Sequence, residues 1–266
     1  MKFMHLLNNK IPNNWNVLDI GGGARPFRRA NSVIDLWNFE DRYSANTWLL
    51  NMPERYTKET WYQFDICDPA ITWNFKDEEF DCITCSHTME DLEKPIKTLE
   101  EIQRISKRGY IEIPSRYAEQ MYNIGESHMQ GYIHHHWIVV PNSETQKVLL
   151  VPKMWDLMSK YRIDCPSPHQ VYPIHVSTGF FWNEKIEFEF LEQEKDVAAF
   201  YEETVDLFKS ISDPWSKTAP YIANTNVDVW NPEKKLYVVS ELEPSEVCSF
   251  EYELARLHYE DSNRKQ

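Results

Sequence analysis

The sequence has few glycines and few basic residues. Only 7 of its 266 residues are glycine, and three of these are consecutive at positions 21–23. Acidic residues number 42 against 28 basic ones, which leaves a formal charge of -14. A phosphate backbone would therefore meet net repulsion unless a local basic patch overrode it. This balance disfavours a nucleic-acid partner.

Long apolar runs and a paired set of cysteines are also missing. No run reaches the length of about 18 apolar residues that a membrane span needs, and residues 1–14 hold no apolar stretch long enough for a secretory signal. The 5 cysteines are odd in number and scattered, mostly within apolar segments, which favours reduced thiols over a disulfide framework. We expect a cytoplasmic protein with no membrane segment; no sequence feature predicts an oligomeric state.

Short apolar segments alternate with other segments over the first 116 residues. Strands are expected over 15–20, 31–36, 62–65, 80–86 and 110–114. Apolar residues recur every three positions from Ile96 to Ile105, which predicts an amphipathic helix over 95–108 that Gly109 ends. This alternation predicts an α/β fold with a doubly wound, mostly parallel Rossmann-like sheet and helices on both faces.

The pattern changes after residue 116. Residues 117–132 are polar and aromatic without a clear period, which favours a lid, and 136–140 with 147–151 predict a hairpin that completes the sheet. The remaining expected elements are a strand over 180–191, a helix over 197–211, a strand over 236–239 and a charged helix over 251–266. We therefore expect an α/β core over 1–116 and a lid region over 117–266 with an elaborated C-terminal half, which could form one continuous domain.

Gly21, Gly22 and Gly23 directly follow the first expected strand. Glycine lets the backbone approach a ligand closely, and N–H groups beyond the loop can face that ligand. The spacing does not match the G-x-G-x-x-G dinucleotide pattern, and the chain has no G-K-[ST] phosphate loop. Alone, the triplet fits an ordinary tight turn as well as a cofactor loop.

Five blocks over residues 15–114 resemble the class I S-adenosylmethionine-dependent methyltransferases, in particular the methyltransferase type 11 group. In order along the chain, the blocks are 17–23, Asp35, Asp65-Ile66, 80–90 with 91–95, and 104–114. Five blocks in the correct order are more specific than any one of them. The resemblance implies an enzyme with a Rossmann-like fold that takes S-adenosylmethionine as its cofactor, with the cofactor-binding core over 1–116 and the lid and substrate region over 117–266.

The resemblance also implies a role for individual residues. Asp19 and the glycine backbone would hold the methionine part of the cofactor, and Asp35 would accept both ribose hydroxyls. Asp65 would take the adenine amino group, and the backbone N–H of Ile66 would meet the ring. The full cofactor set implied is Asp19, Gly21, Gly22, Gly23, Asp35, Leu36, Asp65, Ile66 and Ser86.

Two features depart from the family pattern. The family commonly carries Glu-His after the fourth strand, but this chain has Glu90-Asp91, so a histidine role is not carried over. The connection from Asp19 to Asp35 is short and leaves little room for a first helix.

Methyl transfer depends mainly on positioning and desolvation, and some acceptors also need a base. His87 and Glu90 are the candidate catalytic residues, with further candidates from the lid at His128, His134, His135 and His136. Structural roles stay open for both leading candidates: His87 could cap the strand, and Glu90 could hold a helix N-terminus through its charge.

Histidines are concentrated in the expected lid. Glu126, His128 and residues 134–136, all histidine, fall within eleven residues, a density that could serve a zinc or other divalent site. Consecutive side chains on a strand point to opposite faces, so at most His134 and His136 would share one. We assign no metal. The Cys82 and Cys85 pair lies in an apolar strand without a second pair, which favours core packing.

Aromatic and histidine side chains after residue 116 are the candidates for substrate contact. Tyr117, His128, His134 and His136 are the expected substrate residues, with Tyr122, Tyr132 and Trp137 as further pocket candidates.

The leading prediction is methyl transfer to nitrogen or oxygen of a small-molecule or saccharide-like acceptor. One alternative is metal-dependent hydrolysis by the His128 and His134–His136 cluster, which chelator-sensitive activity without methyl transfer would favour. Another is a non-catalytic protein that binds the cofactor or a partner, which binding without turnover would favour.

Overall fold

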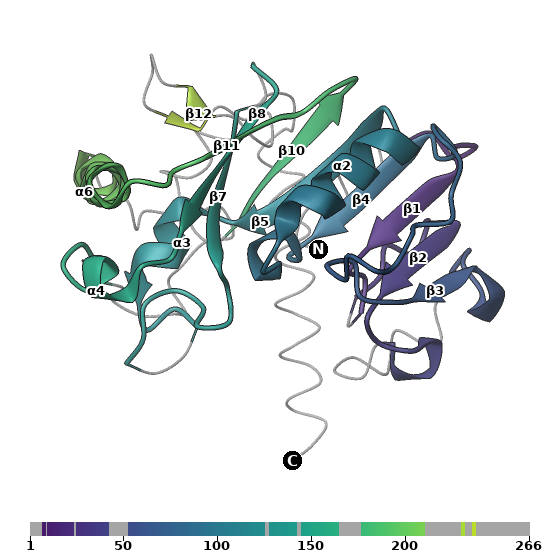
Figure 1. Cartoon of the computed structure of the whole chain (residues 1–266), viewed down its shortest axis with the longest axis horizontal. Helices are drawn as coiled ribbons and strands as arrows, with labels where there is room; N and C mark the ends of the chain where they lie inside the picture. The colour runs from purple at the N-terminus through teal and green to yellow at the C-terminus, as the bar shows by residue number, and fades with distance from the viewer. Residues whose placement is uncertain are drawn as a thin grey trace.

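The computed structural model describes residues 7–8, 10–23, 25–42, 53–125, 128–142, 145–164, 177–210, 230–231 and 236–237. A six-stranded sheet in the order β10-β5-β4-β1-β2-β3 forms its centre (Figure 1). The strands are β1 (Val17–Ile20), β2 (Ser32–Asp35), β3 (Trp61–Gln63), β4 (Cys82–Ser86), β5 (Arg108–Pro114) and β10 (Ser177–Asn183). All neighbours are parallel except β10, which is antiparallel to β5. The predicted α/β fold with a mostly parallel sheet is confirmed.

Side chains along each central strand alternate between two apolar cores. Leu18 of β1 and Ile83 of β4 pack on the face that α2 (Pro95–Ile105) covers (Figure 1). Val17 and Cys82, their neighbours in sequence, belong to the core on the opposite face. Because strand side chains point alternately to opposite faces, apolar residues at every position require both faces to be covered.

The connections on either side of α2 differ from the prediction. The helix ends at Ile105, and β5 begins at Arg108, so the predicted continuation of the helix to residue 108 is wrong. Gly109 lies inside β5, where an added Cβ would come within 2.4 Å of Trp182 Nε1. The glycine therefore allows a close approach of β10 to the sheet and does not end a helix.

The predicted hairpin forms, but in another sheet. β7 (Trp137–Asn142) pairs antiparallel with β8 (Lys147–Pro152), and β11 (Glu187–Phe190) joins β8 to give the order β11-β8-β7. The prediction that this hairpin completes the central sheet is wrong, because β10 takes that edge. The single strand predicted over 180–191 is also divided into β10 and β11, with Glu184 in a left-handed conformation (φ 70°) between them.

The chain after β5 packs against itself through short elements. α3 (Arg116–Gln120) leads into β6 (Met121–Tyr122), which pairs with β9 (Ile163–Asp164). The other elements are α4 (Trp155–Met158), α6 (Glu194–Ser210), β12 (Trp230–Asn231) and β13 (Leu236–Tyr237), with 3-10 turns η1 (Phe39–Asp41), η3 (Lys58–Thr60) and η4 (Met89–Asp91). Every residue of α3 is buried. The start of the segment predicted as a lid is therefore buried.

Several predictions lie partly or wholly outside this description. The helix expected over 251–266 is outside the described residues, and the division of the chain near residue 116 stays a prediction. Among the described residues, none of the helices combines the length and the apolar character needed to cross a membrane.

Candidate functional site

The predicted cofactor acids Asp19 and Asp35 lie at the carboxyl ends of β1 and β2. These neighbouring strands are parallel, so their ends meet at one edge of the sheet. Ligands of doubly wound sheets bind at this edge. The end of β4, which carries Ser86, borders β1 on its other side.

Asp19 is buried and shapes the glycine loop. Its Oδ1 accepts a hydrogen bond from Thr84 Oγ1 at 2.5 Å, and its Oδ2 accepts one from the backbone N–H of Phe27 at 2.7 Å. Burial raises the pKa of Asp19 to about 7 even though both hydrogen bonds lower it. The carboxyl group thus ties the chain after the glycines to the end of β1 and to β4.

The glycine loop passes too close to its neighbours for side chains. Gly21 has a φ of 69°, and an added Cβ would come within 1.9 Å of Thr88 Oγ1. At Gly22 an added Cβ would come within 2.8 Å of Asp19 Oδ2. Glycine is therefore required here both for the backbone conformation and for the approach to the segment after β4.

Asp35 keeps the capacity to accept hydroxyl groups. Its Oδ2 accepts a hydrogen bond from Gly23 N–H at 2.5 Å, and its Oδ1 accepts one from Trp37 N–H at 2.7 Å. Burial raises the pKa of this carboxyl group. The two carboxylate oxygens together have four lone pairs, and backbone N–H groups of Gly23, Trp37 and Leu36 account for three of them, so acceptor capacity remains for a ribose hydroxyl. Leu36 and Trp37 beside it are 63% and 45% exposed and offer an apolar surface. This donor and acceptor set fits a nucleoside.

Asp65 and Ile66 lie in the turn after β3, beyond the end of the strand predicted to contain Asp65. Asp65 is exposed, and its Oδ1 accepts a hydrogen bond from Cys67 N–H at 2.8 Å. The side chain of Ile66 is buried in the core under α2. A ligand can therefore reach the Asp65 carboxylate, whereas Ile66 can offer only its backbone.

A cluster of titratable side chains follows β4. His87 has a φ of 53°, and its Nδ1 lies 3.3 Å from Glu90 Oε1 while its Nε2 lies 3.3 Å from Glu112 Oε1. Burial lowers the pKa of His87, but the hydrogen bonds and charges of Glu112 and Glu90 outweigh it and raise the pKa to about 9. His87 is therefore a cation at neutral pH, which argues against its predicted role as a base.

Buried polar atoms without a partner gather at the same place. Among the described residues, Ser86 Oγ, Glu90 Oε2 and Asp91 Oδ1 are buried and have no hydrogen-bond partner, whereas Glu90 Oε1 faces His87 Nδ1 at 3.3 Å. Each such atom costs about 1–3 kcal/mol, and native structures keep few of them without a reason. Their concentration at the end of β4, beside the cofactor acids, marks a candidate acceptor site.

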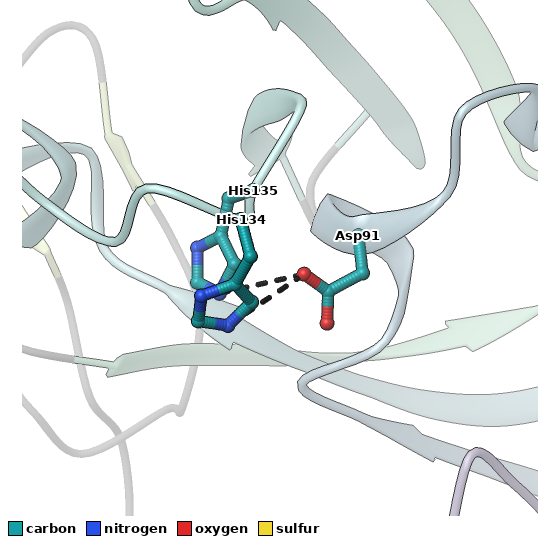
Figure 2. A group of neighbouring side chains, drawn as sticks. All are labelled: Asp91, His134 and His135. Atoms are coloured by element: carbon teal, nitrogen blue, oxygen red, sulfur yellow. Dashed lines mark ion pairs between the residues drawn. The ribbon is translucent and has the colours of Figure 1, made fainter.

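The histidines of the expected lid fall into two groups. His134 and His135 both face Asp91 (Figure 2). His128 and His136 are exposed and lie outside this group. The expectation that at most His134 and His136 share a face is wrong, because residues 131–136 lie outside any strand and their neighbouring side chains need not alternate.

Other predicted contacts lie elsewhere. Tyr117 is buried and packs against Phe208 with ring centroids 5.4 Å apart, so we leave it out of the site. A groove of about 490 Å³ between α2 and β11 is lined by none of the predicted site residues.

Two buried acids of the site region were missed in the sequence. Glu112 interrupts the apolar strand β5 between Ile111 and Ile113, and such a carboxylate in a buried strand is a signal that could have identified it. Glu119 accepts hydrogen bonds from His135 and Lys153, and its neighbours in sequence offer no comparable signal.

Comparison with known proteins gives one family match. The model described as "Methyltransferase domain" matches residues 1–143. No curated protein matches this chain.

Similar solved structures overlap only in part. The YcgJ protein of Bacillus subtilis is 21% identical, with 43% of this chain and 50% of that chain covered and a TM-score of 0.33. An S-adenosylmethionine-dependent methyltransferase from Mesorhizobium loti is 14% identical, with 45% and 57% covered and a TM-score of 0.34. One from Aquifex aeolicus is 18% identical, with 49% and 71% covered and a TM-score of 0.34. The chain thus spans about half the length of the first two.

Proposed function

This chain belongs to the methyltransferase-domain family, and on that premise we propose that it transfers the methyl group of S-adenosylmethionine to nitrogen or oxygen of a small-molecule or saccharide-like acceptor. The family match covers more than half of the chain and confirms the resemblance to class I methyltransferases and their cofactor. It also favours methyl transfer over metal-dependent hydrolysis.

The carboxyl ends of β1, β2 and β3 supply the groups for the cofactor. Asp35 would accept the ribose hydroxyls beside the exposed Leu36, and Asp65 would accept the adenine amino group. Asp19 would contribute to cofactor binding indirectly, by fixing the position of the glycine loop, since both of its oxygens already accept hydrogen bonds from the protein. When bound, S-adenosylmethionine supplies a methyl group on a cationic sulfur, and the acidic residues at this edge suit that charge.

The buried and unpartnered Glu90 Oε2 is the observation on which the proposed acceptor site rests. Glu90 and Glu112 carry two negative charges, and protonated His87 between them carries one positive charge. The remaining negative charge favours an acceptor that donates hydrogen bonds, as amines and hydroxyl groups do. In this proposal Glu90 Oε2 accepts the hydrogen of the acceptor N–H or O–H and takes its proton, and His87 positions the Glu90 carboxylate.

The test is turnover of S-adenosylmethionine by the full chain with a panel of small amines, alcohols and saccharides, followed as formation of the demethylated cofactor by mass spectrometry. Glu90→Gln should lower kcat by about 100-fold or more, the usual contribution of a positioned base, and leave cofactor binding unchanged. Glu93→Gln changes an exposed acid of the same segment and serves as the matched control. Cofactor binding without turnover of any acceptor would favour the non-catalytic alternative instead.

A further inference from the structure

Three side chains beside the proposed acceptor site converge on a common space. Asp91 Oδ1 lies 3.8 Å from His134 Nε2 and 3.7 Å from His135 Nε2 (Figure 2). One ligand atom from each residue can be chosen so that all three lie within 4.8 Å of one another. Both nitrogen–oxygen distances are too long for a hydrogen bond. The three side chains therefore face one another across a gap.

The gap has the dimensions of a metal site. Zinc binds histidine nitrogen and carboxylate oxygen at about 2.0–2.2 Å, so two ligands at the tetrahedral angle lie about 3.4 Å apart. The distances from Asp91 Oδ1 to the two histidine nitrogens exceed this by a few tenths of an ångström, and because the three ligand atoms lie within 4.8 Å of one another, the side chains would draw closer around an ion. Asp91 Oδ1 is also buried without a hydrogen-bond partner, so its lone pairs remain free for an ion.

The residues behind His135 orient it as a ligand. Its Nδ1 lies 2.6 Å from Glu119 Oε1, and Lys153 Nζ lies 2.6 Å from Glu119 Oε2. In the tautomer that donates Nδ1–H to Glu119 Oε1, His135 Nε2 carries the free lone pair. The lone pair on His135 Nε2 is then directed toward Asp91. A carboxylate that orients a ligand histidine in this way is typical of metal centres in proteins.

We propose that Asp91, His134 and His135 bind a divalent transition-metal ion, with zinc the best match to two imidazoles and one carboxylate. Three protein ligands leave a fourth position for water or an oxygen of a bound molecule. The side chain of His134 is 61% exposed, so an ion can reach the group from solvent. The ion would fasten the turn that contains residues 134 and 135 to η4.

This site adjoins the acceptor site but does not depend on it. Asp91 follows Glu90 in sequence, and the backbone N–H of His136 donates a hydrogen bond to Glu90 O at 2.8 Å. Metal binding would thus hold the segment that carries Glu90 in place. It requires neither S-adenosylmethionine nor an acceptor, so it goes beyond the proposed methyl transfer and can be tested separately.

The experiment is a calorimetric titration of zinc chloride into the chelator-treated full chain without cofactor. We expect one equivalent of zinc to bind. His134→Ala and Asp91→Asn should each weaken binding by at least about tenfold, the loss seen even when an outer partner of a ligand is removed. His136→Ala is the matched control, because His136 is an exposed neighbour outside the group and its loss should leave zinc affinity unchanged.

Cobalt gives a second readout of the same site. Cobalt(II) in a four-coordinate site absorbs visible light strongly, and His134→Ala should remove these bands while His136→Ala keeps them. His134 is largely exposed, so its variant should retain the fold, which circular dichroism would verify. Absence of saturable zinc binding to the unaltered chain would overturn the proposal, as would equal losses in His134→Ala and His136→Ala. Either result would leave the proposals of cofactor binding and methyl transfer standing.

Discussion

The cofactor end of the sheet and the segment beyond β5 are held together differently. At the cofactor end, Asp19 and Asp35 accept backbone hydrogen bonds from residues 8 and 12 positions away, and one longer-range bond, from Thr84 to Asp19, joins this motif to β4. Beyond β5, Glu119 contacts His135 and Lys153, which are 16 and 34 positions away, and Arg116 donates a hydrogen bond to Thr204, which is 88 positions away. Hydrogen bonds between residues close in sequence form compact motifs that can be recognised in the sequence. Buried ion pairs between distant residues depend on tertiary packing and cannot be recognised in this way.

The largest effect should come from the buried ion pair of the second region. Lys153 and Glu119 are each 1% exposed, so Lys153→Met leaves the Glu119 carboxylate buried without its main cation. We expect a loss of about 3–5 kcal/mol in the free energy of unfolding, measured with urea. Lys147→Met is the control, because Lys147 pairs with Glu189 at the surface and should cost at most about 1 kcal/mol. Similar losses of unfolding free energy in Lys153→Met and Lys147→Met would contradict the claim that the buried ion pair matters more than the exposed one.

A smaller effect is expected in the glycine loop. Gly21→Ala places a Cβ at a positive φ and against Thr88, which should cost about 1–3 kcal/mol of stability and weaken cofactor binding. Adding Thr88→Ala removes the nearest side-chain atoms but not the backbone strain, so it should restore only part of the stability. Denaturant titration of both variants separates the two causes. Unchanged stability of Gly21→Ala would mean that this loop is not as closely packed as described.

The smallest predicted effect is a pH dependence from His87. Its folded pKa of about 9 lies above the ordinary 6.5, because Glu112 and Glu90 favour the protonated form. The stabilisation is fully present below pH 6.5 and is lost as the pH rises through about 9. The unfolding temperature of the unaltered chain should therefore exceed that of His87→Gln most clearly at about pH 6 and least above about pH 9. A difference that does not change with pH would contradict the protonated state.

The sheet and the cofactor acids were predictable because their signals are local. Buried strands give apolar runs, and Asp19 and Asp35 sit at the ends of two such runs. Ile96 to Ile105 revealed the helix α2, but its last turn was misplaced, because Gly109 serves the approach of Trp182 and not the helix end. A glycine required by tertiary contact cannot be told from a helix stop in one sequence.

The arrangement after β5 was less predictable for the same physical reason. The β7–β8 hairpin was identified by its apolar runs, but which sheet it joins depends on where β10 packs. The histidines were recognised as a group, yet their partner Asp91 comes from η4, 43 positions before His134. In the sequence, Asp91 stands out only because it differs from the family pattern. The structure shows that Asp91 faces His134 and His135, which the spacing of these residues in the sequence does not reveal.

The most direct test of the central claim is calorimetric binding of S-adenosylmethionine to the full chain and to Asp35→Ala. The account predicts one saturable site and a loss of affinity of about tenfold or more in the variant, because each hydrogen bond to a charged group contributes about 1.5–3 kcal/mol. Asp81→Ala is the matched control, since Asp81 lies next to the opposite end of β4, where it accepts a hydrogen bond from Asn16 N–H. Equal affinity of Asp35→Ala and the unaltered chain, or no binding by the unaltered chain, would contradict the account.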